Sequence, residues 1–144
     1  MPADPTDLLQ AIYKRYAKFT GPTDAYTLTV GRLYRTQAPA GAKFPYIVVT
    51  LVGGSIGEMF SGNALEDATV QMSVFDEFRN DASGASAIMQ SLIAIFNWCE
   101  LHVPAAETFI RMRREGLQQE VTEDQTHIHV FQDWLIERQV PAWR

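Results

Sequence analysis

The sequence predicts an α+β fold: a single domain over residues 1–144, in which two α-helices pack on a mainly antiparallel β-sheet. Three observations carry this prediction. The length of 144 residues suits one domain. Patterns with helical and strand periods follow each other in the order helix, strands, helix, strands, which is typical of the α+β class. Residues 68–74 alternate strictly between apolar and polar side chains, as a half-buried strand does.

The first helix is expected to begin in the segment DPTD. Asp4 can cap it, Pro5 suits the first helical position, and Asp7 places a negative charge at the positive end of the helix dipole. An apolar stripe at helical spacing then predicts the face that packs on the core, while Lys14, Arg15 and Lys18 are expected to face outward. The stripe consists of Leu8, Leu9, Ile12, Tyr13, Tyr16 and Phe19.

Residues 25–44 contain many turn-forming residues and are expected to form short strand-like pieces, with a turn from Pro39 to Gly41. Residues 45–52, PYIVVTLV, are apolar at nearly every position, which predicts a central strand that is buried on both faces. Residues 67–75 predict a strand with one core face and one uncharged polar face. The core face would hold Ala68, Val70, Met72 and Val74, and the polar face Thr69, Gln71 and Ser73.

The stretch LVGGSIGEMFSGN, residues 51–63, contains four glycines between these two strands. A phosphate-binding loop would need GxxxxGK[ST] or GxGxxG leading into a helix, and neither is present. The stretch therefore predicts a mobile hairpin connection. Apolar side chains on such a tip favour a contact surface, so Gly54, Ile56, Met59 and Phe60 are predicted to contact a partner or another subunit.

Residues 80–101 predict the second helix, with Ile88, Leu92, Ile95, Phe96 and Cys99 along its packing side. ETFIRMRREG and THIHVFQDWLIER predict two further strands, joined by the acidic, loop-like QQEVTED. Residues 1–5 and 139–144 are expected to be flexible termini.

The composition limits the classes of function. The formal net charge of −5 argues against a surface that wraps nucleic acid. The single cysteine excludes an intrachain disulfide and a cysteine zinc cluster. The N-terminal segment lacks the pattern of a signal peptide, and no apolar run is long enough to span a bilayer, so we expect synthesis in the cytoplasm and no membrane partner.

Candidate chemical sites are few. His127 and His129 would share one strand face and supply two metal ligands, but the sequence shows no third ligand at a recognisable spacing. Arg111 and Arg113 would also share a strand face, where they can contact nucleic-acid phosphates or pair with carboxylates such as Glu137 or Glu77. Cys99 has no neighbouring base and is expected in the core. No catalytic residue, cofactor site or metal site is predicted, and the protein is expected not to be an enzyme.

Several segments together resemble the tail completion, or tail terminator, proteins of long-tailed bacteriophages. The resemblance rests on the series Arg32, Leu33, Tyr34, Ala38, Pro39, Phe44, Pro45, Tyr46 and Ile47, on the alternating strand that ends in Phe75 and Asp76, and on the apolar late strand after an acidic loop. It extends from about Leu8 to Glu137. The segment LHVPAAETF and the tryptophans Trp98, Trp134 and Trp143 depart from the pattern.

The resemblance implies a virion protein of the tail and neck, whose copies form a hexameric ring on the head-proximal end of the tail tube. Its partners would be further copies of itself, the major tail tube protein and the head connector, or stopper, protein, and genomic DNA would pass through the channel without specific binding. Thr69, Gln71 and Ser73 would line the lumen or an interface, and Arg111, Arg113 and Trp143 would join the contact residues. Two alternatives stay open: another neck or head-tail adaptor subunit, and a small α+β ligand- or metal-binding module.

Overall fold

The computed structural model describes residues 5–58, 63–77, 83–101, 109–122 and 127–141. Its elements, in order, are α1 (Pro5–Lys18), α2 (Ala25–Leu28), β1 (Leu33–Arg35), β2 (Tyr46–Glu58), β3 (Asn63–Glu77), α3 (Ser83–Phe96), β4 (Cys99–Glu100), β5 (Phe109–Thr122) and β6 (His127–Pro141). The predicted α+β class, a single domain with a mainly antiparallel sheet, is confirmed. Within the described segments, no helix has the length and apolar character that crossing a bilayer requires.

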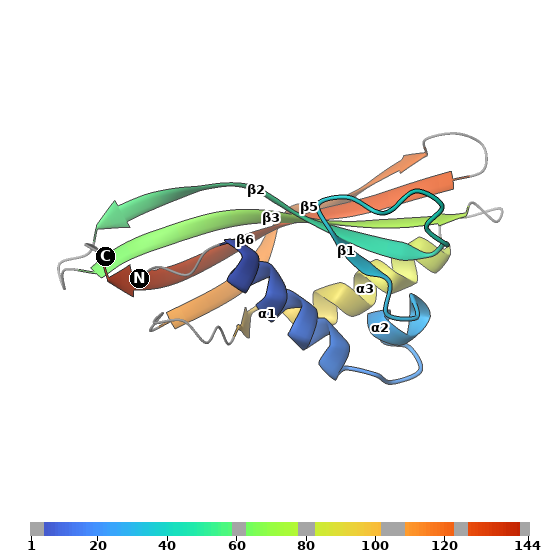
Figure 1. Ribbon diagram of the computed structural model, residues 1–144, viewed down its shortest axis with the longest axis horizontal. Helices are drawn as coiled ribbons and strands as arrows, with labels where there is room; N and C mark the ends of the chain where they lie inside the picture. Colours follow the sequence, from blue (N-terminus) through green and yellow to red (C-terminus); the bar gives the residue numbers. More distant parts are fainter. Residues whose placement is uncertain (1–4, 59–62, 78–82, 102–108, 123–126, 142–144) are drawn as a thin grey trace.

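One sheet of six strands has the order β1-β2-β3-β6-β5-β4. Only β1 and β2 run parallel, and every other neighbouring pair is antiparallel. The three helices all lie on the same side of the sheet, and the opposite face carries no helix (Figure 1). We call this second surface the helix-free face. The ends of β2, β3 and β6 extend beyond the helices as a long arm (Figure 1).

The core lies between the sheet and the helices. The alternation predicted for residues 68–74 is confirmed, since its four apolar side chains are all buried in the core. Ile12 and Tyr16 of α1 and Ile88, Leu92, Ile95 and Phe96 of α3 are buried too, as their helical spacing predicts. Arg15 does not simply face outward. Its Nε donates a hydrogen bond of 2.8 Å to the carbonyl oxygen of Ile95 and so ties α1 to α3.

The glycine-rich stretch is mostly a strand and not a loop, which corrects the prediction. Residues 51–58 belong to β2 and pair with β3 as far as Glu58 opposite Ala64. Glycine is permissive enough to adopt extended backbone, and pairing with a long, regular neighbour holds it there. At Gly53, an added Cβ would meet no atom within 4 Å, so no packing contact requires a glycine at that position.

The strand predicted as central lies second from the edge of the sheet. It is buried on both faces only where β1 covers its side: Ile47, Val48 and Val49 are at most 9% exposed. Beyond the three residues paired with β1 the burial ends, and Val52 is 59% exposed. An apolar run in the sequence indicates that a strand is buried, but it does not show how many of its residues the neighbouring strand pairs with.

Several further boundaries differ from the predictions. Residues 118–122, expected as part of an acidic loop, belong to β5. Residues 25–28 form the helix α2 and not a strand-like piece. Helix α3 ends at Phe96, so Cys99 lies in β4, although it is buried in the core as expected. Burial raises the pKa of the Cys99 thiol, which makes the nucleophilic thiolate less accessible. Strand β6 continues to Pro141, so residues 139–141 are paired with β3 and are not part of a flexible end.

Asp76 joins the end of β3 to the start of α3. Its carboxylate accepts a hydrogen bond from the Glu77 backbone N–H at 2.7 Å, and it is only 8% exposed. A Cβ added at Gly84 would come within 2.6 Å of Asp76 Oδ2. The carboxylate therefore lies against the first turn of α3, where the helix dipole favours a negative charge, and a side chain at position 84 would displace it.

Tyr16 should make stability depend on alkaline pH. Its hydroxyl donates to Thr29 Oγ1, which in turn donates to the Ala25 carbonyl at 2.7 Å, and burial raises the pKa of Tyr16 to about 12. The unfolded chain releases this proton nearer pH 10. The corresponding contribution to stability is therefore complete below about pH 10 and is lost as pH rises towards 12. Unfolding by urea at several pH values should show this loss.

The Tyr16→Phe variant should lose about 1 kcal/mol of stability at neutral pH through the missing hydrogen bond, and its stability should fall less between pH 10 and 12. Tyr34→Phe, on the other face of the sheet, is the matched control and should keep the alkaline loss of the parent. Equal alkaline slopes for Tyr16→Phe and the parent would contradict the assignment.

Candidate interaction surface on the helix-free face

The helix-free face changes in character along the strands. One end is aromatic, the middle is polar, with uncharged side chains on β2 and β3 and carboxylates on β6 and β5, and the other end carries arginines paired with a carboxylate. The register produces this gradient, because side chains in directly paired positions of neighbouring strands share a face. Tyr46, Phe75 and His129 form one such row, and Thr50, Gln71, Asp133 and Glu115 form another.

At the aromatic end, side chains from four segments form one cluster of stacked and edge-on rings. His129 stacks on Phe75 with 4.2 Å between ring centroids, and Phe75 in turn stacks on Tyr46 at 5.1 Å. His127 stacks on Phe44 at 4.8 Å. We call the whole group the aromatic cluster; it consists of Tyr34, Phe44, Tyr46, Phe75, His127, His129 and Phe131.

Every member of the aromatic cluster is half-buried by its neighbours and no helix covers it. Stacked aromatic side chains with an accessible edge are typical of contact surfaces. His127 and His129 do share one strand face, as predicted, but their rings stack on phenylalanines. The described residues contain no group of three histidine, cysteine or acidic side chains that could hold a metal ion.

The polar middle contains the three residues predicted to line a lumen or an interface, and all three lie on the helix-free face. Gln71 Nε2 donates a hydrogen bond of 3.1 Å to Asp133 Oδ1 on β6. Ser73 is only 6% exposed, because it lies between Val48 and Phe131 in the register. Ser73 is therefore covered by its neighbours. Thr69 and Gln71 are half-buried, so parts of their side chains are exposed at the surface.

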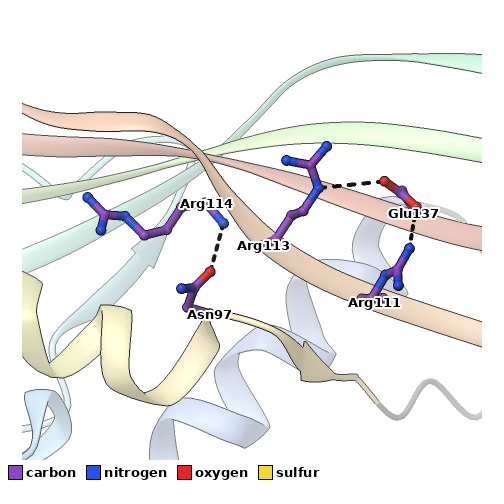
Figure 2. Close-up of polar contacts among 5 residues, drawn as sticks. All are labelled: Asn97, Arg111, Arg113, Arg114 and Glu137. Atoms are coloured by element: carbon purple, nitrogen blue, oxygen red, sulfur yellow. Dashed lines mark hydrogen bonds and ion pairs between the residues drawn. The ribbon is translucent and has the colours of Figure 1, made fainter.

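At the charged end, Arg111 and Arg113 of β5 both approach Glu137 of β6, at 3.1 and 3.8 Å, which confirms that the two arginines share a face (Figure 2). The guanidinium carbon of Arg111 also lies 6.0 Å from the centre of the Trp98 ring. Arg114 points to the other side, where its Nε donates to Gln132 Oε1 at 3.2 Å and its backbone N–H to Asn97 Oδ1 at 3.1 Å. The basic segment thus contributes to both faces.

The Glu137 ion pairs should contribute little to stability. Both arginine side chains are about two-fifths exposed, and solvent screens such pairs. We expect Glu137→Gln to lower the free energy of unfolding by about 1 kcal/mol or less, measured by urea denaturation at low salt. Raising the salt concentration should narrow the difference from the parent. A loss several times larger would show that Glu137 has a structural role beyond these pairs.

Of the remaining predicted contact residues, the structure describes two. Gly54 and Ile56 lie in β2, in the arm beyond the helices. Met59, Phe60 and Trp143 lie outside the described residues. The aromatic cluster was not predicted, although alternation at residues 127–131 places two histidines and Phe131 on one face. The missing information was the register that brings Tyr46 and Phe75 beside them.

Comparisons with known proteins support a fold but not a family. No family model matches the sequence, and no curated protein matches it. The structure is similar to a chain in a solved structure described as the virion of a native gene transfer agent (GTA) particle, with a TM-score of 0.66 and 12% identity. The similarity covers 87% of this chain and 91% of the other, so nearly the whole domain shares that fold.

Proposed function

We propose that this protein is a structural, non-catalytic subunit of a phage or phage-like virion: a tail terminator that forms a ring on the head-proximal end of the tail tube. One observation carries the proposal. The fold extends over almost the full length of a chain from a virion particle, at a TM-score of 0.66. The resemblance of the sequence to tail terminators supports the finer role.

The helix-free face supports the same conclusion independently. A single sheet layer with helices on one side only leaves its second face to solvent or to a partner. Here that face combines an aromatic cluster with partly exposed arginines, and aromatic and arginine side chains are enriched at protein interfaces. In the proposed assembly this face contacts the tube, the head connector or another subunit. Its polar middle, with Thr69 and Gln71, is part of the contact surface.

Electron microscopy of tails assembled with and without this protein tests the proposal. In its absence we expect overlong tubes or tails that do not join heads, and addition of the purified protein should restore joining. Normal tail length and normal joining in its absence would overturn the proposal. Image reconstruction of the neck separates a terminator, which caps the tube, from an adaptor, which stays with the head connector.

A further inference from the structure

The sheet has two open edges. On one side, β1 pairs only with residues 47–49 of β2, and no other described strand pairs with the outer side of β2 from Thr50 to Glu58. On the other side, β4 pairs only with Arg111 and Met112 of β5, and Asn97 receives the N–H of Arg114. Among the described strands, none pairs with the outer side of β5 beyond that point. An open strand edge offers backbone donors and acceptors to another chain.

Both open edges contain a β-bulge that turns an aliphatic side chain outward. In β2, Val52 has no partner in β3, because Leu51 pairs with Val70 and Gly53 with Thr69. In β5, residues 116–118 have no partners in β6, and Gly116 has a φ of +78°, which suits glycine. Val52 is 59% exposed and Leu117 is 81% exposed.

Among the described residues, the exposed large hydrophobic side chains include one on each open edge, Val52 and Leu117. Four large hydrophobic residues are strongly exposed: Val30, Val52, Trp98 and Leu117. Val30 precedes β1 and Val52 lies in β2, whereas Trp98 precedes β4 and Leu117 lies in β5. Proteins that avoid edge association place charged residues or proline at open edges. A bulge can itself protect an edge by twisting it, but here the bulged positions hold exposed valine and leucine in place of a charge or proline, so both edges keep an apolar contact.

We propose that the β2 edge of one copy pairs with the β5 edge of the next copy, so that the sheet continues from subunit to subunit. This inference rests on the proposed ring and names its subunit interface. A ring needs two different, complementary patches on each subunit, and the two edges supply them. The strand directions also fit: three successive antiparallel pairings, β2 with β3, β3 with β6 and β6 with β5, make β2 and β5 run in opposite directions. Copies related by rotation about the ring axis would therefore pair β2 and β5 antiparallel.

Two lysine variants test the interface. In Val52→Lys the β2 edge is blocked, and in Leu117→Lys the β5 edge is blocked. Both positions are exposed, so the thermal unfolding temperature should stay at that of the parent. By sedimentation velocity, each variant alone should be monomeric at concentrations at which the parent assembles, with the Kd of self-association raised roughly tenfold or more. Ala94→Lys, an exposed position on α3, adds the same charge on the helix side and should assemble like the parent.

A mixture of the two variants gives the sharpest result. Val52→Lys keeps an intact β5 edge and Leu117→Lys an intact β2 edge, so an equimolar mixture should form heterodimers and nothing larger. Either variant assembling like the parent would overturn the inference, and so would homodimers of one variant, which would indicate a contact between identical edges. A parent that stays monomeric at its highest soluble concentration would also overturn it. The tail-length experiment would still decide the proposed function, because it does not depend on which surfaces join the subunits.

Discussion

Replacing Trp134 with alanine should lower the free energy of unfolding by about 3 to 5 kcal/mol, the usual cost of truncating a large buried aromatic side chain. Trp134 is fully buried in the middle of β6 and meets Phe96 of α3 edge-on at 6.2 Å. It thus connects one of the two central strands of the sheet to helix α3. Thermal and urea unfolding measure the loss, which should appear as a large fall in the melting temperature.

The matched control for Trp134 is phenylalanine. The indole Nε1 is buried and has no hydrogen-bond partner among the described residues, so Trp134→Phe removes a donor that forms no bond there and retains most of the aromatic surface. This variant should be clearly more stable than Trp134→Ala. Equal losses for the two variants would mean that the indole N–H has an acceptor in the folded protein and that its bond, not packing, dominates.

Replacing Gln132 with methionine should lower stability by about 1 to 3 kcal/mol, because buried polar groups would lose their partners. Gln132 is fully buried. Its Nε2 donates to the carbonyl oxygens of Glu115 and Gly116 at 3.3 and 3.1 Å, and its Oε1 accepts from Arg114 Nε at 3.2 Å. The side-chain amide of Gln132 therefore stabilises the bulge of β5, in which Leu117 points outward. Amide hydrogen exchange at residues 115–117 should accelerate in the variant.

Gln71→Met is the control for that experiment, since Gln71 is half-buried and its side-chain amide donates a hydrogen bond to Asp133 on the helix-free face. It should cost about 1 kcal/mol or less and leave exchange in the bulge unchanged. Equal exchange in Gln132→Met and the parent would show that the backbone of β5 keeps the bulge without the Gln132 amide. Weaker self-association of Gln132→Met is a further expected result if the β5 edge forms the subunit interface.

Periodicity in the sequence predicted much of the fold. The stripe of α1 and the alternation of β3 identified buried residues correctly, because the spacing of apolar residues is fixed by local backbone geometry. The pairing of Arg111 and Arg113 with Glu137 was among the predicted alternatives for the same reason: residues two apart on a strand share a face, and a carboxylate stood on a strand expected nearby.

The errors fall where one segment's conformation depends on another. Their composition predicted a loop for the glycine-rich residues 51–58. In the structure β3 is extended and paired along its whole length with β6, and residues 51–58 form a strand by pairing with β3. Residues 25–28 read as strand-like, but the short helix α2 packs on α3, where Ser91 Oγ accepts the N–H of Ala25 at 2.7 Å. Local propensity is weak enough for such tertiary contacts to override it.

The sequence by itself therefore determined the α+β class, the main core residues and the sharing of a strand face by residues two apart, because these follow from the period of the backbone and from burial. Only the tertiary structure decided which strands lie side by side, where the sheet ends and which side chains form the aromatic cluster. The physical reason is that strand pairing and register are contacts between distant segments. The open edges of β2 and β5, on which the proposed subunit interface depends, are a consequence of that pairing.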